Sequence, residues 1–190
     1  MALKRLFDWE VIIPLNKHIF IINGSGGSGK DTFVKLVRAE LNDIYKRFDT
    51  VDNYSSIDKI KEVAHGFGYS NGKTEKDRKF LSDLKHLVGD YSDTPFICMK
   101  ERVSEFYSNN KNFILFLHIR EPEEIKRASK EFSAKTILIK NNKIKHITSN
   151  DSDKNIFNYK YDYIIKNNGT IEDLDEKAKI FIGELINDEG

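Results

Sequence analysis

The sequence predicts a three-layer α/β fold in which helices flank a mainly parallel sheet of five strands. Short apolar runs, typical of strands, alternate with longer segments whose apolar residues recur at three- and four-residue intervals. The run 112–119 is apolar at successive positions, as in a strand buried on both faces of a parallel sheet. A glycine-rich stretch, 24–29, stands between an apolar run and an amphipathic one. Such alternation indicates parallel strands joined by helical crossovers.

The elements can be placed along the chain by the same patterns. Strands are expected at 18–23, 50–55, 112–119, 136–139 and 161–165. The first helix is expected to begin at Lys30, and a second to run from 57 toward 66–68. Further helices are expected at about 75–89, at 96–107, from 121 onward and at 170–186. Proline and acidic residues favour a helix start near 121, and Thr170 is of a type that caps helices. The carboxyl ends of parallel strands share one edge, where ligands bind. The glycine-rich loop, Ser55, Arg120 and Asn167–Asn168 are therefore expected at that edge.

Length and composition restrict the class of protein. The chain has 190 residues, three prolines and no linker-like stretch, so we expect a single domain over 18–190 with residues 1–17 as an N-terminal extension packed on it. Lys and Arg total 31 against 30 for Asp and Glu, a balance that argues against nucleic-acid and membrane partners. One cysteine, Cys98, and the lack of a long apolar run or signal-peptide pattern suggest a cytoplasmic protein. The oligomeric state stays open.

Residues 24–32 have the spacing G-x-x-x-x-G-K of a phosphate-binding loop of the Walker A type. Glycines let backbone N–H groups converge on phosphate oxygens and tolerate positive φ angles, and the following helix adds positive charge at its N-terminus. Lys30 would reach the β- and γ-phosphates. The residues expected to hold a nucleoside triphosphate are Gly24, Ser25, Gly26, Gly27, Ser28, Gly29, Lys30, Asp31 and Thr32.

Asp31 departs from the usual pattern, which has the Ser or Thr that contacts magnesium at this position. We expect Asp31 to contact Mg²⁺ through water or to stabilise the helix N-terminus, and Thr32 to supply a hydroxyl group. Phosphoryl transfer also needs cations from outside the loop. The candidates are Lys59, Arg78, Arg120 and Arg127.

Other signatures are missing from the sequence. It has no Asn-Lys-x-Asp guanine signature, which weakens a GTPase interpretation, and the strand 112–119 does not end in the carboxylate that a motor ATPase would have there but leads into His118, Arg120 and Glu121. The five histidines show no paired metal-ligand spacing, and no Gly-x-Ser-x-Gly hydrolase motif occurs.

Several segments together resemble those of the P-loop nucleoside monophosphate kinases, in particular the deoxynucleoside monophosphate kinase-like and phosphomevalonate kinase-like members. The similarity lies in Ser28-Gly-Lys-Asp31, in 55–59, in 74–81, in His118-Ile-Arg120 and in 161–170. It implies a P-loop NTPase fold, ATP as donor and Mg²⁺. It also implies that Lys30, Arg120 and Arg127 are catalytic, that Ser55, Lys59 and Arg78 bind the acceptor, and that Asn167 and Asn168 lie near the adenine.

The resemblance differs at His118, where the family usually has an aspartate. His118 could be a catalytic group or a hydrogen-bonded residue of the core, and the sequence leaves both roles open. Tyr54 or Tyr69 could stack on a base. A phosphate acceptor needs no strong base, whereas a hydroxyl acceptor would need a carboxylate such as Asp52 or Asp58.

The expected function is ATP-dependent phosphoryl transfer to a nucleoside or deoxynucleoside monophosphate, and the expected partner is this small phosphorylated acceptor. One alternative is a kinase for another small phosphorylated metabolite, of the phosphomevalonate or dephospho-coenzyme A type. The other is a nucleotide-binding regulatory module without turnover.

Overall fold

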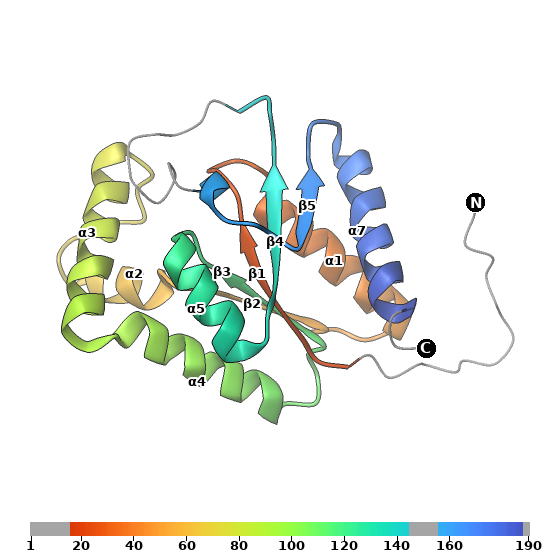
Figure 1. Ribbon diagram of the computed structural model, residues 1–190, viewed down its shortest axis with the longest axis horizontal. Helices are drawn as coiled ribbons and strands as arrows, with labels where there is room; N and C mark the ends of the chain where they lie inside the picture. The colour runs from red at the N-terminus through yellow and green to blue at the C-terminus, as the bar shows by residue number, and fades with distance from the viewer. Residues whose placement is uncertain (1–15, 145–155, 188–190) are drawn as a thin grey trace, which may run out of the picture.

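The computed structural model describes residues 16–144 and 156–187 (Figure 1). The N-terminal extension expected at 1–17 therefore lies outside the described residues, apart from Asn16 and Lys17. Lys17 Nζ donates to the backbone carbonyl oxygens of Phe106 and Asn109. The chain at the start of the first strand is thus tied to the end of a helix on one face of the sheet.

Five parallel strands form the sheet, which confirms the predicted fold class. They are β1 (His18–Asn23), β2 (Val51–Ser55), β3 (Ile114–His118), β4 (Lys135–Lys140) and β5 (Tyr163–Lys166), in the spatial order β2-β3-β1-β4-β5. Ser55 pairs with His118, and His118 pairs with Ile22, so β2, β3 and β1 end level with one another. This register brings their carboxyl ends to one edge of the sheet.

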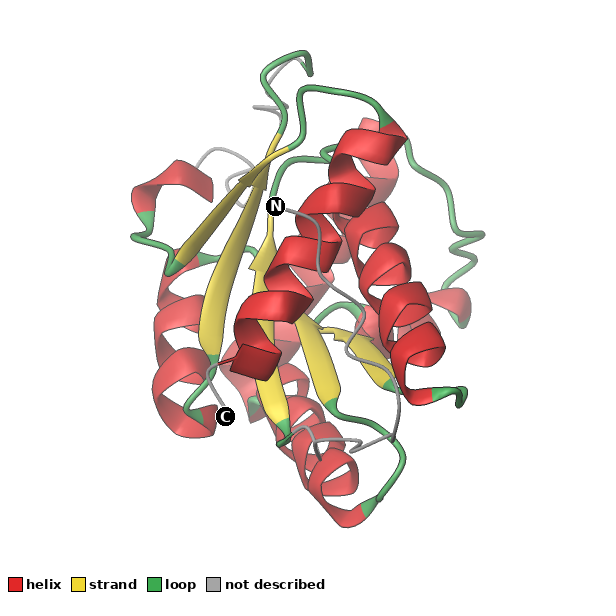
Figure 2. Cartoon of the chain, turned by 90° about the vertical axis from the view of Figure 1, so that its right-hand side faces the viewer, coloured by secondary structure: helices red, strands yellow, loops and turns green. Residues whose placement is uncertain are grey.

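Helices cover both faces of the sheet, as Figure 2 shows with the strands between them. They are α1 (Lys30–Tyr45), α2 (Asp58–His65), α3 (Glu75–Ser92), α4 (Thr94–Ser108), α5 (Pro122–Phe132) and α7 (Ile171–Asn187), with a short 3-10 helix at Ile156–Asn158. Phe20 and Ile22 of β1 pack with α1 and α7, whereas Ile19 and Ile21 pack with α4 and α5. Burial of alternate residues on opposite faces explains the unbroken apolar runs.

The helices α2 and α3 form a smaller unit to the left of the sheet in Figure 1. Ile60 and Ala64 of α2 pack on Leu81 of α3 in a separate apolar cluster. A capping box starts α3, in which Thr74 accepts from the Asp77 backbone N–H and the Asp77 side chain accepts from the Thr74 backbone N–H. This unit supplies one wall of the site described below.

Several element boundaries differ from those expected by one or more residues, and those of α3 and β5 bear on the site. The helix α3 extends to Ser92, three residues beyond the expected end, and only Asp93 in the left-handed conformation separates it from α4. The strand β5 begins at Tyr163 instead of residue 161. Tyr161 is buried, and its hydroxyl group contacts the end of β1. Among the described helices, none is both long and apolar enough to cross a membrane.

Candidate functional site

The loop between β1 and α1 has a conformation that requires glycine at two positions. Gly24 has φ of 148°, and a Cβ there would lie 2.4 Å from the carbonyl oxygen of Ile139. Gly29 has φ of 97°, and a Cβ there would lie 2.3 Å from Asn167 Nδ2. A side chain at either position would strain the backbone and collide with a neighbouring element. The loop therefore runs close against β4 and the segment after β5.

Gly29 is also the N-cap of α1, where no side chain caps the helix. The first N–H groups of a helix have no intrahelical acceptor. In α3, by contrast, the Thr74 side chain accepts from one of these groups. The N-terminus of α1 thus presents uncapped donors and the positive end of its dipole to the space above the loop.

The side chains of two asparagines form hydrogen bonds with the backbone of the loop. Asn23, which is fully buried, accepts from the Gly24 N–H at 2.7 Å and donates to the Arg120 carbonyl oxygen at 3.1 Å and to Tyr161 Oη at 2.8 Å. Burial raises the pKa of Tyr161 to about 12, which keeps its hydroxyl group protonated as a donor to the Ile156 carbonyl oxygen. Asn167 Nδ2 donates to the Ser28 carbonyl oxygen at 2.9 Å. Sequence reasoning missed Asn23 and the anchoring role of Tyr161.

Lys30 lies over the rim of this loop. Its Nζ donates to the carbonyl oxygens of Gly24 at 2.5 Å and of Ser25 at 3.1 Å. The neighbouring Asp31 has a side chain that is 85% exposed. An ammonium group held by carbonyl oxygens at a loop of this shape is positioned to contact phosphate oxygens.

A cavity of about 570 Å³ opens beside the loop, between the carboxyl ends of the strands and the unit formed by α2 and α3. Its lining combines predicted site residues from distant parts of the chain. They are Gly26, Gly27, Lys30 and Asp31 of the loop, Ser55 after β2, Arg78 of α3 and Arg120 after β3. The cavity therefore lies at the edge formed by the carboxyl ends of the strands, where the sequence predicted a ligand site.

Lys59 is not among the residues that line this cavity. Its Nζ contacts both carboxylate oxygens of Glu62 at 2.9 Å. Because successive helical residues lie about 100° apart, residues two positions apart lie on nearly opposite sides of the helix. Lys61 lines the cavity instead. The rotation of α2 about its axis therefore places Lys61, and not Lys59, at the cavity.

Arg127 also lies away from the cavity. Its guanidinium group forms hydrogen bonds of 2.8 and 2.5 Å with Asp93 and lies 3.6 Å from the ring centroid of Phe96. These contacts connect α5 to the start of α4. Neither Thr32 nor Asn168 lines the cavity, and Asn168 Oδ1 accepts from the Asn142 N–H at 2.8 Å.

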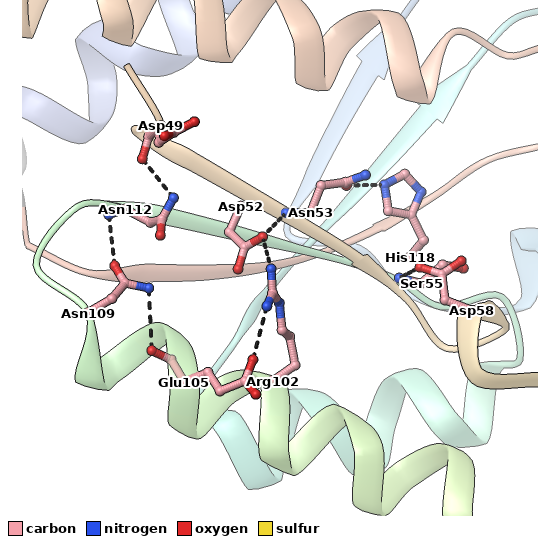
Figure 3. A network of polar contacts seen from close by, with 10 residues as sticks. All are labelled: Asp49, Asp52, Asn53, Ser55, Asp58, Arg102, Glu105, Asn109, Asn112 and His118. Carbon is pink, nitrogen blue, oxygen red and sulfur yellow. Dashed lines mark hydrogen bonds and ion pairs between the residues drawn. The ribbon is translucent and has the colours of Figure 1, made fainter. Parts of the chain in front are cut away.

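Of the two tyrosines considered for stacking on a base and the two carboxylates considered as proton acceptors, one of each lines the cavity. Tyr69 lines the cavity, whereas Tyr54 packs against the core, where burial raises its pKa to about 12. Asp58 lines the cavity, and its Oδ2 accepts from the Ser55 N–H at 2.9 Å. Asp52 points toward α4, where its Oδ1 accepts from Arg102 at 2.6 Å (Figure 3).

Three further lysines line the cavity that the sequence did not single out: Lys61, Lys73 and Lys85. Lys85 is largely buried and lies 2.9 Å from Glu121 Oε2 and 2.5 Å from Glu124 Oε2. Burial alone would lower the pKa of Lys85, but the two carboxylates hold it above its ordinary value. Glu121 and Glu124 therefore offset the charge of Lys85, and Lys61 Nζ lies 3.4 Å from Asp58 Oδ1.

His118 stands at the end of β3 and faces two elements. Its Nε2 lies 2.6 Å from Asn53 Oδ1, and Figure 3 shows the two side chains pointing toward one another. Its Nδ1 lies 4.0 Å from Asp31 Oδ1. Burial lowers the pKa of His118 to about 4 although Asp31 acts in the opposite direction, so the imidazole is neutral near pH 7.

A metal ion at this site would depend on few protein ligands. Within the described ranges, no group of three or more His, Cys, Asp and Glu residues is arranged to hold a metal. Asp31 is a carboxylate beside the phosphate loop, which fits Mg²⁺ because this ion usually takes one or two carboxylates and completes its shell with phosphate oxygens and water.

The parallel sheet and the glycine loop between β1 and α1 give the chain the fold of a P-loop protein. No protein-family model and no curated protein matches the chain. Among solved structures, it is similar to shikimate kinase from Aquifex aeolicus vf5, with 15% identity, coverage of 87% of this chain and 96% of that chain, and a TM-score of 0.46.

Two other solved structures show comparable likeness. Thymidylate kinase from Ehrlichia chaffeensis is 12% identical, with coverage of 88% of this chain and 99% of that chain and a TM-score of 0.46. The Mycobacterium tuberculosis APS kinase CysC, in complex with AMPPNP and APS, is 14% identical, with coverage of 92% and 99% and a TM-score of 0.44. Likenesses this distant carry no argument about the activity of this chain.

Proposed function

We propose that this chain transfers the γ-phosphoryl group of ATP to a small phosphorylated acceptor, and that the acceptor is a nucleoside or deoxynucleoside monophosphate. One observation carries the proposal: the phosphate loop and a second set of cations line the same cavity. A protein that only bound and released a nucleotide would need the loop but not the second set. Two anion sites that share one cavity suit transfer between two phosphorylated molecules.

The donor site consists of the loop residues 24–32. The uncapped N-terminus of α1 and the loop amides would hold the phosphates, and Lys30 would exchange its carbonyl partners for phosphate oxygens. Asp31 would contact the metal ion, directly or through water, with Thr32 beside it. Asn167 would act chiefly by holding the Ser28 carbonyl, and Asn168 would follow it near the adenine.

The acceptor site lies on the opposite wall. Lys61, Lys73 and Arg78 line it, with Ser55 nearby and Tyr69 as the aromatic surface for a base. A second phosphate brought close to ATP repels it, and cations on this wall would offset that repulsion. The volume of about 570 Å³ is typical of a site for a small molecule.

Transfer itself would require little acid–base chemistry. An ionised phosphate oxygen of the acceptor would attack the γ-phosphorus, the bond to the bridging oxygen would break, and ADP would leave with that electron pair. Arg120, at the end of β3 between the two walls, would offset charge on the moving group. In this proposal Lys61 takes the role expected of Lys59, and Arg127 stabilises the packing of α5 on α4.

An acceptor panel tests the proposal. The protein would be mixed with ATP, Mg²⁺ and each candidate in turn: the common nucleoside and deoxynucleoside monophosphates, phosphomevalonate and dephospho-coenzyme A. Formation of ADP and of the phosphorylated product would be followed by phosphorus NMR. We expect rapid transfer to at least one nucleoside monophosphate, and no transfer by the Lys30→Met variant.

The other outcomes separate the alternatives. Transfer to phosphomevalonate or dephospho-coenzyme A alone would show that the acceptor class is wrong and the kinase chemistry right. Tight binding of ATP with no transfer to any candidate would favour the regulatory module.

A further inference from the structure

His118 and Asp31 lie close together at the wall of the cavity, and each carries an atom that can donate an electron pair to a metal ion. The two side chains come from different elements, the end of β3 and the first turn of α1, and their nearest atoms, Nδ1 and Oδ1, lie 4.0 Å apart. His118 is 13% exposed in its side chain, whereas Asp31 is 85% exposed and can turn toward the ring. Both residues line the cavity.

The hydrogen bond to Asn53 determines which nitrogen of His118 carries the proton. Asn53 Oδ1 can only accept, so Nε2 must be the donor across the 2.6 Å contact. A neutral imidazole has one N–H group, so Nδ1 then carries a lone pair. This Nδ1 atom lies 4.0 Å from Asp31 Oδ1, which is also an electron-pair donor. Two such electron-rich atoms repel each other, whereas a cation between them would be coordinated by both.

The arrangement around His118 is that of a metal ligand. A histidine that ligates a metal usually donates its other N–H to a carbonyl or carboxylate oxygen, which fixes the tautomer and the ring orientation. Asn53 provides this contact from β2. Nitrogen–metal and oxygen–metal bonds of about 2.0–2.2 Å place neighbouring ligand atoms about 3–3.5 Å apart, so the exposed Asp31 carboxylate would turn about 0.5–1 Å toward His118 to share one ion with it.

We propose that His118 Nδ1 and Asp31 together ligate a divalent cation directly, and that the imidazole makes this position favour a transition-metal ion such as Co²⁺ over Mg²⁺. The inference rests on the proposed nucleotide site, because the protein supplies only two ligands and phosphate oxygens would supply others. Imidazole nitrogen suits transition metals, whereas Mg²⁺ prefers carboxylate, phosphate and water oxygens.

The charges around the site make metal binding depend on the nucleotide. Lys30 and Arg120 lie close enough to His118 to act on it electrostatically and oppose a divalent ion in the free protein, whereas the carboxylates of Asp31 and Asp58 act in the opposite direction. A bound triphosphate would offset them and add oxygen ligands. Strong metal binding at His118 is therefore expected with a nucleotide and weak binding without one.

Cobalt(II) provides a direct readout. The full-length protein would be titrated with Co²⁺ in the presence and absence of AMP-PCP, a non-hydrolysable ATP analogue, and followed by proton NMR. An imidazole bound to Co²⁺ through Nδ1 keeps an exchangeable N–H at Nε2, whose signal is shifted far outside the ordinary range and disappears in deuterium oxide. We expect one such signal, present only with the analogue.

Two variants assign the signal. In His118→Gln the side-chain amide can still donate to Asn53 but places no ligand at the Nδ1 position, so the signal should disappear and the Co²⁺ affinity of the complex should fall about tenfold or more, with little change for Mg²⁺. In the matched control His86→Gln, at an exposed position on α3, both should stay as in the wild type. If His118→Gln does not fold, His118→Asn serves as the second variant.

The outcomes distinguish this inference from the proposed function. Binding of AMP-PCP with Co²⁺ but without an imidazole signal that depends on His118 would overturn the inference and leave the nucleotide site standing. Equal losses of Co²⁺ and Mg²⁺ affinity in His118→Gln would overturn the metal preference. If AMP-PCP does not bind with either metal, the proposed function fails, and the inference fails with it.

Discussion

Single residues decide the shape of the phosphate loop, and Gly29 is the clearest case. Its φ of 97° and the 2.3 Å approach of Asn167 Nδ2 to the position of a Cβ leave no room for alanine. We expect Gly29→Ala to lower the free energy of unfolding by about 1–3 kcal/mol and to weaken ATP binding, because the bond from Asn167 to Ser28 must shift. Urea denaturation and ATP titration would measure both effects.

Gly89→Ala is the control for this substitution. Gly89 lies inside α3 with no atom within 4 Å of an added Cβ. Alanine there should raise the free energy of unfolding by about 0.5–1 kcal/mol. A Gly29→Ala protein as stable as the wild type would show that the described loop conformation is wrong.

The lysines of α2 provide a second prediction about single residues. Loss of a charge-assisted hydrogen bond to the acceptor should raise the KM for the acceptor about 10- to 100-fold in Lys61→Ala, with a smaller change in kcat. Lys79→Ala, which removes an exposed partner of Asp83, is the control. Steady-state kinetics with the acceptor varied would measure the effect. If Lys59→Ala raised the KM more than Lys61→Ala, the sequence-based assignment would be the better one.

These residues also mark what the sequence can and cannot predict at a site. The loop is recognisable because its residues are adjacent and their spacing is constrained by one ligand. The choice between Lys59 and Lys61 depends on the rotation of α2 about its axis, which a short helix with few apolar residues leaves uncertain. The contact of Asn23 with Tyr161 joins residues 138 positions apart, and no local pattern indicates it.

At the scale of elements, the helix α5 is attached through a buried group of charges. Glu121 and Glu124 share the single ammonium group of Lys85, which also donates to Ser56 Oγ. Burial raises the pKa of Glu124 from 4.5 to about 7, with Lys85 acting against the rise and Glu121 adding to it. The folded protein therefore binds a proton at Glu124 more tightly than the unfolded chain does.

The sign of the resulting pH dependence follows from this difference. Between about pH 4.5 and pH 7 the folded state holds more protons at Glu124, so the free energy of unfolding should fall as the pH rises through this window. The fall is at most about 3–4 kcal/mol, at 1.36 kcal/mol for each unit of difference in pKa. Glu124→Gln should flatten the slope, as measured by denaturation at a series of pH values. Glu123→Gln, at an exposed position on α5, should keep it; equal slopes in the two variants would contradict the prediction.

The elements themselves follow well from sequence patterns. Strands such as β1 and β3 are buried on both faces, so their apolar runs are long enough to recognise. The residues at which strands and helices begin and end are harder to predict, because contacts with distant parts of the chain determine them. Tyr161 is apolar enough to continue a strand, but its hydroxyl group is used at the end of β1, and β5 starts after it.

At the scale of the whole molecule, the alternation of elements predicts a parallel sheet but not the order of its strands. The order β2-β3-β1-β4-β5 places β3 between β2 and β1, which brings Ser55 and His118 level with the end of β1. The helices α2 and α3, to the left of the sheet in Figure 1, supply residues of the second wall of the cavity. That wall depends on packing between distant segments, and no local sequence pattern indicates which cations it brings to the cavity.

The central claim is that the loop and Lys30 hold a triphosphate, and calorimetry tests it most directly. AMP-PCP with Mg²⁺ would be titrated into the wild-type protein and into Lys30→Met, with Lys35→Met, an exposed residue of α1, as the control. We predict saturable binding to the wild type and the control, and an affinity about 10- to 100-fold lower for Lys30→Met. No binding to the wild type, or equal binding to Lys30→Met, would contradict the account.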